Sequence, residues 1–171
     1  MTDERVKFSD SDSLISTTTS DSHITYCNED FCQVAGYKEE ELLGKPHNVI
    51  RHADMPKPAF GQLWEYIQSG KSWMGLVKNK CKTSGHYWVS AFVTPIMDKD
   101  GKVYEYQSVR TQPTDEQISR AYSLYSKLRK GAVSVRRIEW MNLSFGLTFA
   151  QLAVLIAFAL GAFSTPVMLA I

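Results

Sequence analysis

The sequence contains few or none of the features that several common protein classes require. Its 171 residues include only three cysteines, Cys27, Cys32 and Cys81, whose spacing matches no zinc site. An odd number of cysteines in a reducing compartment argues against a disulfide framework. The formal net charge of +1 gives no reason to expect binding to nucleic acid. We therefore expect neither a metal site nor a nucleic-acid partner.

The motifs of common nucleotide-binding and hydrolytic enzymes are also absent. No GxGxxG follows a predicted strand, and neither GxxxxGK[ST] nor GxSxG occurs. The two common phosphate-binding loops and the nucleophile elbow are therefore missing. Serine, cysteine and histidine residues are present, but no spacing singles one out as a catalytic nucleophile. The sequence thus favours a protein that is not an enzyme.

The last part of the sequence lacks charge altogether. No charged residue follows Glu139, and the stretch from Leu143 to Gly161 is rich in Leu, Ala, Phe, Val and Ile. About 20 such residues suffice to cross the core of a bilayer, whereas a buried helix of a globular domain normally keeps a polar face. We therefore predict a helical linker over residues 113–139 and a transmembrane anchor over residues 140–171.

The residues around and within this segment predict its orientation and its association. Basic residues lie just before it and none follows, which keeps the N-terminal part in the cytoplasm under the positive-inside rule: Lys127, Arg129, Lys130, Arg136 and Arg137. We expect a single-pass protein of the inner (cytoplasmic) membrane. Small residues recur at spacings of three or four, so that two such helices can approach closely and form a homodimer: Gly146, Ala150, Ala153, Ala157 and Gly161.

The remaining sequence predicts an α+β domain over residues 13–112, preceded by a disordered N-terminus over residues 1–12. Asn28 is the expected N-cap of a helix that stops at Gly36. Thr114 and Gln117 form a capping box that starts the linker helix. The other expected elements are a short helix ending at Gly44, a helix over 59–69, and strands over 13–19, 24–27, 73–82, 86–97 and 103–110. This order predicts an antiparallel sheet with short helices on one face and a pocket between the layers.

A cluster of polar residues lies in the stretch PHNVIRHADMP, residues 46–56. His47, His52 and Asp54 match no standard metal-site spacing, so a structural hydrogen-bond network and an anion site remain as alternatives. In an anion site, Arg51 would offer a planar fork to a phosphate, His52 a second donor and Asp54 an orienting carboxylate. Aromatic residues in the sequence suit a flat ring beside that phosphate: Trp64, Trp73, Tyr87 and Trp88.

Two long stretches resemble the PAS domains of bacterial aerotaxis receptors. The resemblance begins in SDSHITYCNEDFCQVAGYKEEELLGKPHNVIRHADMP and continues through WMGLVKNKCKTSGHYWV to the start of the linker helix. It covers about residues 13–128. The segment PHNxxRHxDMP carries most of its specificity. The resemblance implies a PAS fold, with a five-stranded antiparallel sheet and short helices on one face.

The resemblance also implies a cofactor and the residues that bind it. PAS domains of this type bind FAD non-covalently and report redox state or oxygen. Matching positions imply that Arg51, His52 and Asp54 hold FAD and that Asn28, Trp73 and Asn79 lie at or near the flavin ring. Further pocket residues are expected at three positions: His47, Asn48 and Tyr87.

Other cofactors and functions are weaker alternatives. A light-sensing flavin domain needs a cysteine in the segment Asn48 to Arg51, where none occurs, which argues against a covalent photo-adduct. Haem ligation by His47, His52 or His86, an interaction module with an empty pocket, and a small flavoenzyme remain as alternatives. Nothing in the sequence resembles a nicotinamide site.

Longer aerotaxis receptors continue beyond the membrane into a module that controls a histidine kinase, whereas this sequence stops at Ile171. We therefore expect a truncated relative of such a receptor, a sensor subunit that works through a partner, or one half of a split receptor. The expected signalling partner is a chemoreceptor or a kinase-control module.

Overall fold

The computed structural model describes residues 4–132 of the chain. No helix within these residues is long and apolar enough to cross a membrane. The predicted transmembrane anchor, its stripe of small residues and the end of the predicted linker lie outside the described residues. The predicted domain boundaries at residues 13 and 112 stay predictions.

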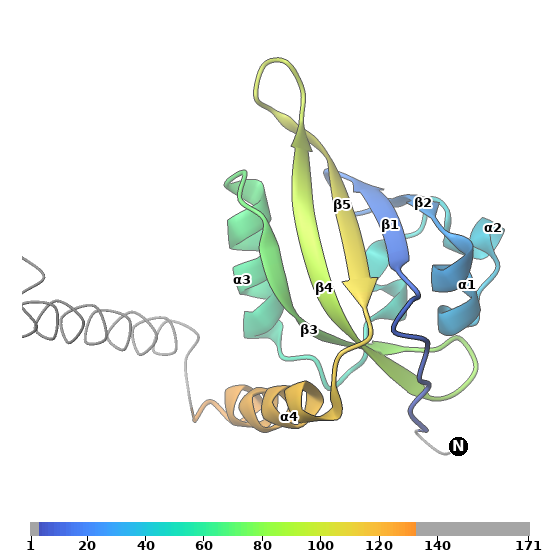
Figure 1. Cartoon of the computed structure of the whole chain (residues 1–171). Helices are drawn as coiled ribbons and strands as arrows, with labels where there is room; N and C mark the ends of the chain where they lie inside the picture. Colours follow the sequence, from blue (N-terminus) through green and yellow to red (C-terminus); the bar gives the residue numbers. More distant parts are fainter. Residues whose placement is uncertain (1–3, 133–171) are drawn as a thin grey trace, which may run out of the picture. The chain divides into compact units, whose positions relative to one another are not determined.

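The described chain forms a five-stranded antiparallel sheet, as expected from the sequence (Figure 1). Its order is β2-β1-β5-β4-β3, so the first strands pair with the last one and the hairpin of β3 and β4 forms the other half. The strands are β1 (Leu14–Thr19), β2 (Ile24–Cys27), β3 (Trp73–Lys80), β4 (His86–Met97) and β5 (Val103–Thr111).

Short helices between β2 and β3 cover one face of the sheet. They are α1 (Glu29–Ala35), α2 (Glu39–Leu42), the 3₁₀ turn η1 (His47–Ile50) and α3 (Lys57–Gln68). Figure 1 shows α1 and α2 beside β1 and β2, and α3 beside β3 and β4. The core between the two layers contains apolar side chains that are almost fully buried: Leu14, Phe31, Leu42, Ile50, Ile67 and Val89.

The expected ends of α1 are confirmed. The side chain of Asn28 accepts a hydrogen bond from the backbone N–H of Phe31, and Gly36 ends the helix with φ of 74°. Helix α3 starts at Lys57, two residues earlier than the sequence pattern indicates. Pro58 lies in its first turn, where the missing N–H of proline costs no intrahelical hydrogen bond.

Helix α4 (Asp115–Arg129) begins at the predicted capping box of Thr114 and Gln117. It packs on the face of the sheet opposite the short helices. This placement follows from the stacking of Tyr125 on Trp88, with ring centroids 6.3 Å apart. Trp88 alternates along β4 with the residues that face the short helices. The Tyr125 hydroxyl also donates to the carbonyl of Leu76 at 2.5 Å.

The N-terminal segment is a correction to the sequence prediction, because residues 4–6 are paired rather than disordered. The N–H of Val6 donates to the carbonyl of His86 at 2.8 Å, and the N–H of His86 donates to the carbonyl of Glu4 at 2.9 Å. The pairing of β4 with β5 starts only at Ser90, so the first residues of β4 offer free backbone groups on that edge. Arg5 reinforces the segment through an ion pair with Asp115 at 2.6 Å.

Candidate ligand-binding pocket

A pocket with a volume of about 330 Å³ lies between the sheet and the short helices. A pocket between these two layers is expected from the sequence. Its volume is at the lower end of the range of roughly 300–1,000 Å³ that small-molecule sites occupy. One wall is apolar and comes from α3 and from the inner face of β3 and β4: Phe60, Leu63, Trp64, Ile67, Val77, Ala91 and Val93.

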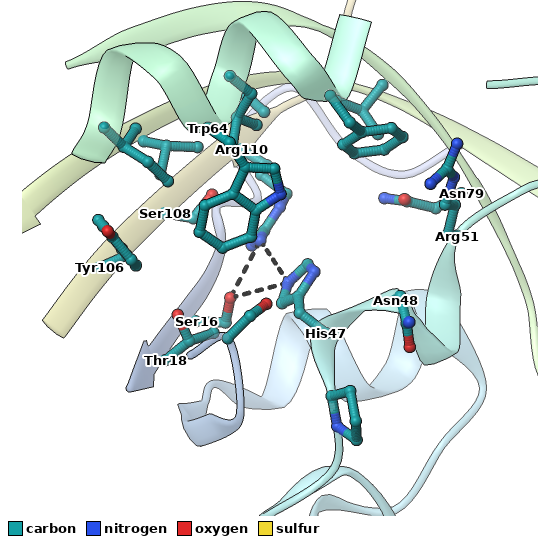
Figure 2. A pocket seen from close by; sticks show the side chains of 18 of the residues that line it. Ser16, Thr18, His47, Asn48, Arg51, Trp64, Asn79, Tyr106, Ser108 and Arg110 are labelled. Atoms are coloured by element: carbon teal, nitrogen blue, oxygen red, sulfur yellow. Dashed lines mark hydrogen bonds between the residues drawn. The ribbon is translucent and has the colours of Figure 1, made fainter. Parts of the chain in front are cut away.

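The floor of the pocket is polar and combines residues of three elements (Figure 2). Ser16 of β1, His47 of η1 and Arg110 of β5 point toward one another. Nη2 of Arg110 donates to Ser16 Oγ at 3.0 Å and contacts His47 Nε2 at 2.8 Å. A guanidinium can only donate, so Nε2 of His47 accepts this bond and the ring carries its proton on Nδ1.

Burial keeps this histidine neutral. Desolvation, with a further contribution from the positive charge of Arg110, lowers the pKa of His47 from 6.5 to about 3. Burial also lowers the pKa of Arg110 to about 10, which still leaves the guanidinium charged at neutral pH. The floor therefore carries one positive charge, which lies on Arg110, because His47 is neutral.

Three buried polar atoms near the pocket have no hydrogen-bond partner among the described residues: Asn79 Nδ2, Tyr87 Oη and Ser108 Oγ. Asn79 and Ser108 line the pocket, whereas Tyr87 lies directly across from Asn79 on β4. Burial raises the pKa of Tyr87, and the positive charge of Arg110 and, to a smaller extent, the Asn79 amide oppose that rise. Unpaired buried groups of this kind are uncommon in folded proteins and indicate a missing polar partner.

The structure brings four of the residues predicted to bind a cofactor to the pocket wall: His47, Asn48, Arg51 and Asn79. Arg51 and Asn79 form an isolated backbone bridge, which joins the segment after η1 to β3. The guanidinium of Arg51 lies 4.3 Å from the centre of the Phe60 ring and donates to the carbonyl of Met55 at 3.1 Å.

Asn28 lies outside the pocket lining, in a structural position. Its Oδ1 accepts from the N–H groups of Ile15 and Phe31 at 2.9 and 3.2 Å. Its Nδ2 donates to the carbonyl of Ser13 at 2.7 Å. The side chain therefore fixes the start of α1 against β1.

His52 and Asp54 also lie outside the pocket lining, next to the face that carries α4. The N–H of Asp54 donates to Nδ1 of His52 at 3.0 Å. The Asp54 carboxylate accepts from Nζ of Lys78 at 2.9 Å, and the Asp54 carbonyl accepts from Nη1 of Arg129 in α4. The hydrogen bond from Lys78 lowers the pKa of Asp54. These contacts tie the segment after η1 to β3 and α4.

Trp73 and Tyr87 complete the set of predicted residues that do not line the pocket. Trp73 is 7% exposed, and its Nε1 donates to Oε1 of Gln62 in α3 at 3.4 Å. Tyr87 is fully buried and is the register partner of Asn79 on the neighbouring strand. That these two residues, with Asn28, His52 and Asp54, contact a cofactor stays a prediction.

Sequence reasoning missed the residues that β1 and β5 contribute to the pocket. Arg110 is the most important, because a charged residue on a central strand is normally expected to face solvent. Hydropathy alone places Val109 inward instead. The pairing of Arg110 with Leu14 and Ala91, set by the two neighbouring strands, turns its side chain into the pocket. The other missed polar residues are Ser16, Thr18, Tyr106 and Ser108.

Comparison with known proteins identifies relatives of this chain. Residues 24–110 match the family model described as PAS fold. The chain is 43% identical over 136 residues to the aerotaxis receptor of Escherichia coli, a match that covers 80% of this chain and 27% of the receptor. It is 27% identical over 115 residues to the nitrogen fixation regulatory protein of Klebsiella pneumoniae, covering 67% of this chain and 22% of that protein. The chain thus spans about a quarter of the length of these relatives.

Solved structures support the same fold. The dark-state structure of the LOV domain of the blue-light photoreceptor aureochrome1 superposes with a TM-score of 0.58 at 17% sequence identity. The match covers 70% of this chain and 86% of that one. At this identity the likeness concerns the fold.

Proposed function

This chain belongs to the PAS fold family, and on that basis we propose that it is a sensor that binds FAD non-covalently and reports redox or oxygen state in aerotaxis-type signalling. A role as a signal-transduction sensor of the PAS type follows from the relation of the chain to the aerotaxis receptor. These relatives are receptors and regulators, which favours a signalling role without catalytic turnover.

The observation that carries the proposal is the unpaired polar groups inside the pocket. Asn79 Nδ2 and Ser108 Oγ are buried without a partner among the described residues. Leaving one such group unpaired costs on the order of 1–3 kcal/mol, so a ligand with hydrogen-bonding edges would stabilise the domain. The edge of a flavin ring carries donors and acceptors, and a neutral amide such as Asn79 serves either.

The shape and the other residues of the pocket fit the same ligand. A flat ring system suits the space between the apolar sheet face and the aromatic side chains of Phe60 and Trp64 on α3. Arg51 lies on the pocket wall and has the planar fork that suits a phosphate group. When bound, FAD would supply a group that accepts and releases electrons, which no amino-acid side chain of the pocket does.

For the residues outside the described part of the chain, we base the proposal on the sequence. Residues 140–171 would anchor the sensor in the inner membrane with the PAS domain in the cytoplasm, and the chain would act as a homodimer. A chemoreceptor or a kinase-control module would receive the signal. Membrane fractionation of cells expressing the full chain, with protease digestion of inside-out and right-side-out vesicles, tests the anchor and its orientation.

The visible spectrum of the purified full chain tests the cofactor. We expect the absorption bands of oxidised flavin, bleaching by dithionite, and release of FAD on denaturation. A colourless protein that stays colourless after incubation with FAD and removal of the free dinucleotide would contradict the proposal. A haem spectrum would show that the cofactor is haem and not FAD. Steady oxidation of NADH or NADPH would favour a flavoenzyme.

A further inference from the structure

Arg110 is a buried cation without a negative partner in the described part of the chain. It is 4% exposed, and its hydrogen bonds go to Ser16 Oγ, the carbonyl of Leu14 and Nε2 of His47. The Phe31 ring lies 5.2 Å from the guanidinium carbon. All of these groups are neutral. A charge that is taken out of water without a counter-charge is strongly disfavoured, so its retention calls for a function.

No acidic group inside the described pocket balances this charge. Among the described lining residues the only carboxylate belongs to Asp21. Its side chain is 73% exposed and pairs with His23 at 3.0 Å. The floor instead offers hydrogen-bond donors, because a guanidinium has five N–H groups and the bonds of Arg110 to neighbouring residues do not use all of them.

We infer that Arg110 is a ligand-binding residue that holds the electron-rich edge of the bound ring, where a carbonyl oxygen or ring nitrogen gains negative charge on reduction. This inference rests on the proposed function and adds to it the residue that sets the electronic state of the ring. Charge-assisted hydrogen bonds are stronger than neutral ones, and they strengthen further as the acceptor becomes more negative. Arg110 would therefore bind the reduced ring more tightly than the oxidised ring.

A phosphate group is the other ligand chemistry that a guanidinium binds, but the surroundings of Arg110 do not favour it. Arg110 lies at the buried floor beside Ser16 and His47, where few donors are available for the several oxygens of a diphosphate. Arg51 lies on another wall of the same pocket and is better placed for that role (Figure 2). The ring edge and the phosphate can be separated experimentally, because riboflavin has the ring and lacks the phosphate.

The first experiment measures the affinities of the full chain for FAD and riboflavin with wild-type Arg110 and with Arg110→Gln. We expect Arg110→Gln to weaken the binding of both ligands at least tenfold and by similar factors. Arg120→Gln, which makes the same change at a side chain 71% exposed on α4, should leave both affinities unchanged. A loss confined to FAD would assign Arg110 to the phosphate and overturn the inference, as would unchanged affinity for both ligands.

The second experiment uses FAD alone. It measures how the charge at position 110 changes the midpoint potential of the bound flavin. In a dithionite titration, two electrons pass from dithionite, which is oxidised to sulfite, to the ring, and solvent supplies the accompanying protons. We expect the midpoint potential of Arg110→Gln to be lower by at least about 30 mV, which corresponds to a tenfold loss of preference for the reduced form in a two-electron couple. Arg110→Lys, which keeps the positive charge, should stay closer to the wild-type potential.

The controls separate failure of this inference from failure of the proposed function. A wild-type chain that binds no flavin contradicts the proposed function. A wild-type chain that binds flavin while both Arg110 variants keep its affinity and potential contradicts only the inference. The melting temperatures without ligand must be similar in wild type and Arg110→Gln; a large drop would show that Arg110 acts through folding and would overturn the assignment.

Discussion

Replacement of Asp54 by Asn tests whether the ion pair between Asp54 and Lys78 stabilises the fold. Asp54 accepts a hydrogen bond from Lys78 Nζ at 2.9 Å, and the side chain of Lys78 is only 5% exposed, whereas that of Asp54 is 44% exposed. Breaking a fully buried ion pair costs about 3–5 kcal/mol, and a surface pair contributes about 0–1 kcal/mol. With one partner buried and the other exposed, we expect Asp54→Asn to lower the free energy of unfolding by about 1–3 kcal/mol.

The assay is urea unfolding of the full chain in mild detergent without ligand. A loss of about 2 kcal/mol shifts the midpoint by about 1 M, for slopes of roughly 1–3 kcal/mol per M. Glu116→Gln is the matched control, because Glu116 pairs with Arg120 on α4 at 3.8 Å with both side chains at least 71% exposed. It should change stability by less than about 0.5 kcal/mol. Equal effects of the two substitutions would refute the reasoning.

The same pair predicts a dependence on pH. The hydrogen bond from Lys78 lowers the folded-state pKa of Asp54 below its ordinary value of 3.8. A carboxylate with a lowered pKa stabilises the fold above its unfolded pKa, and this contribution is lost as the pH falls through the folded pKa. The stability difference between wild type and Asp54→Asn should therefore be full at pH 7 and shrink below about pH 4. A difference that stays constant down to pH 3 would contradict the ion pair as its source.

Three further predictions follow from other contacts. Asn28→Ala removes the cap of α1 and should cost about 1–2 kcal/mol in urea unfolding; unchanged stability would contradict the capping role. Tyr125→Phe removes the hydrogen bond to the Leu76 carbonyl and should cost about 1 kcal/mol and speed amide exchange in α4; unchanged exchange would contradict the docking of that helix. Burial lowers the folded-state pKa of His47 to about 3, so the unfolded state binds more protons than the folded state between that pH and 6.5. The free energy of unfolding should therefore rise with pH over this window, and His47→Gln should flatten the rise. An equal slope in the variant would show that His47 is not buried in its neutral form.

The sequence predicts most of the fold because its signals are local. The cap at Asn28, the left-handed glycine at Gly36 and the capping box of Thr114 and Gln117 each depend on residues close in the chain, and the structure confirms all three. The face on which α4 packs depends on a contact between Tyr125 and Trp88, which are distant in sequence. The same holds for the pairing of Glu4 to Val6 with His86.

The candidate site is only partly predictable for the same reason. His47, Asn48 and Arg51 lie in one short segment with a distinctive sequence, and all three line the pocket. Arg110 enters the pocket because of its register against two neighbouring strands, which no local pattern specifies. Asp54 shares the distinctive segment but turns toward Lys78 of β3 and Arg129 of α4, and the ring of His52 lies beside that of His86 on β4. A chain that leaves a 3₁₀ turn cannot direct every side chain to one side.

The central claim, that a flavin occupies this pocket, is tested most directly by titrating the ligand-free full chain and its Ala91→Leu variant with FAD. Ala91 is 3% exposed and lines the pocket from β4, so the larger side chain fills the space that the ring needs. We predict saturable binding of one FAD per chain to the wild type and none to Ala91→Leu, with unchanged far-ultraviolet circular dichroism. Equal binding by the folded variant, or no binding by the wild type, would contradict the account.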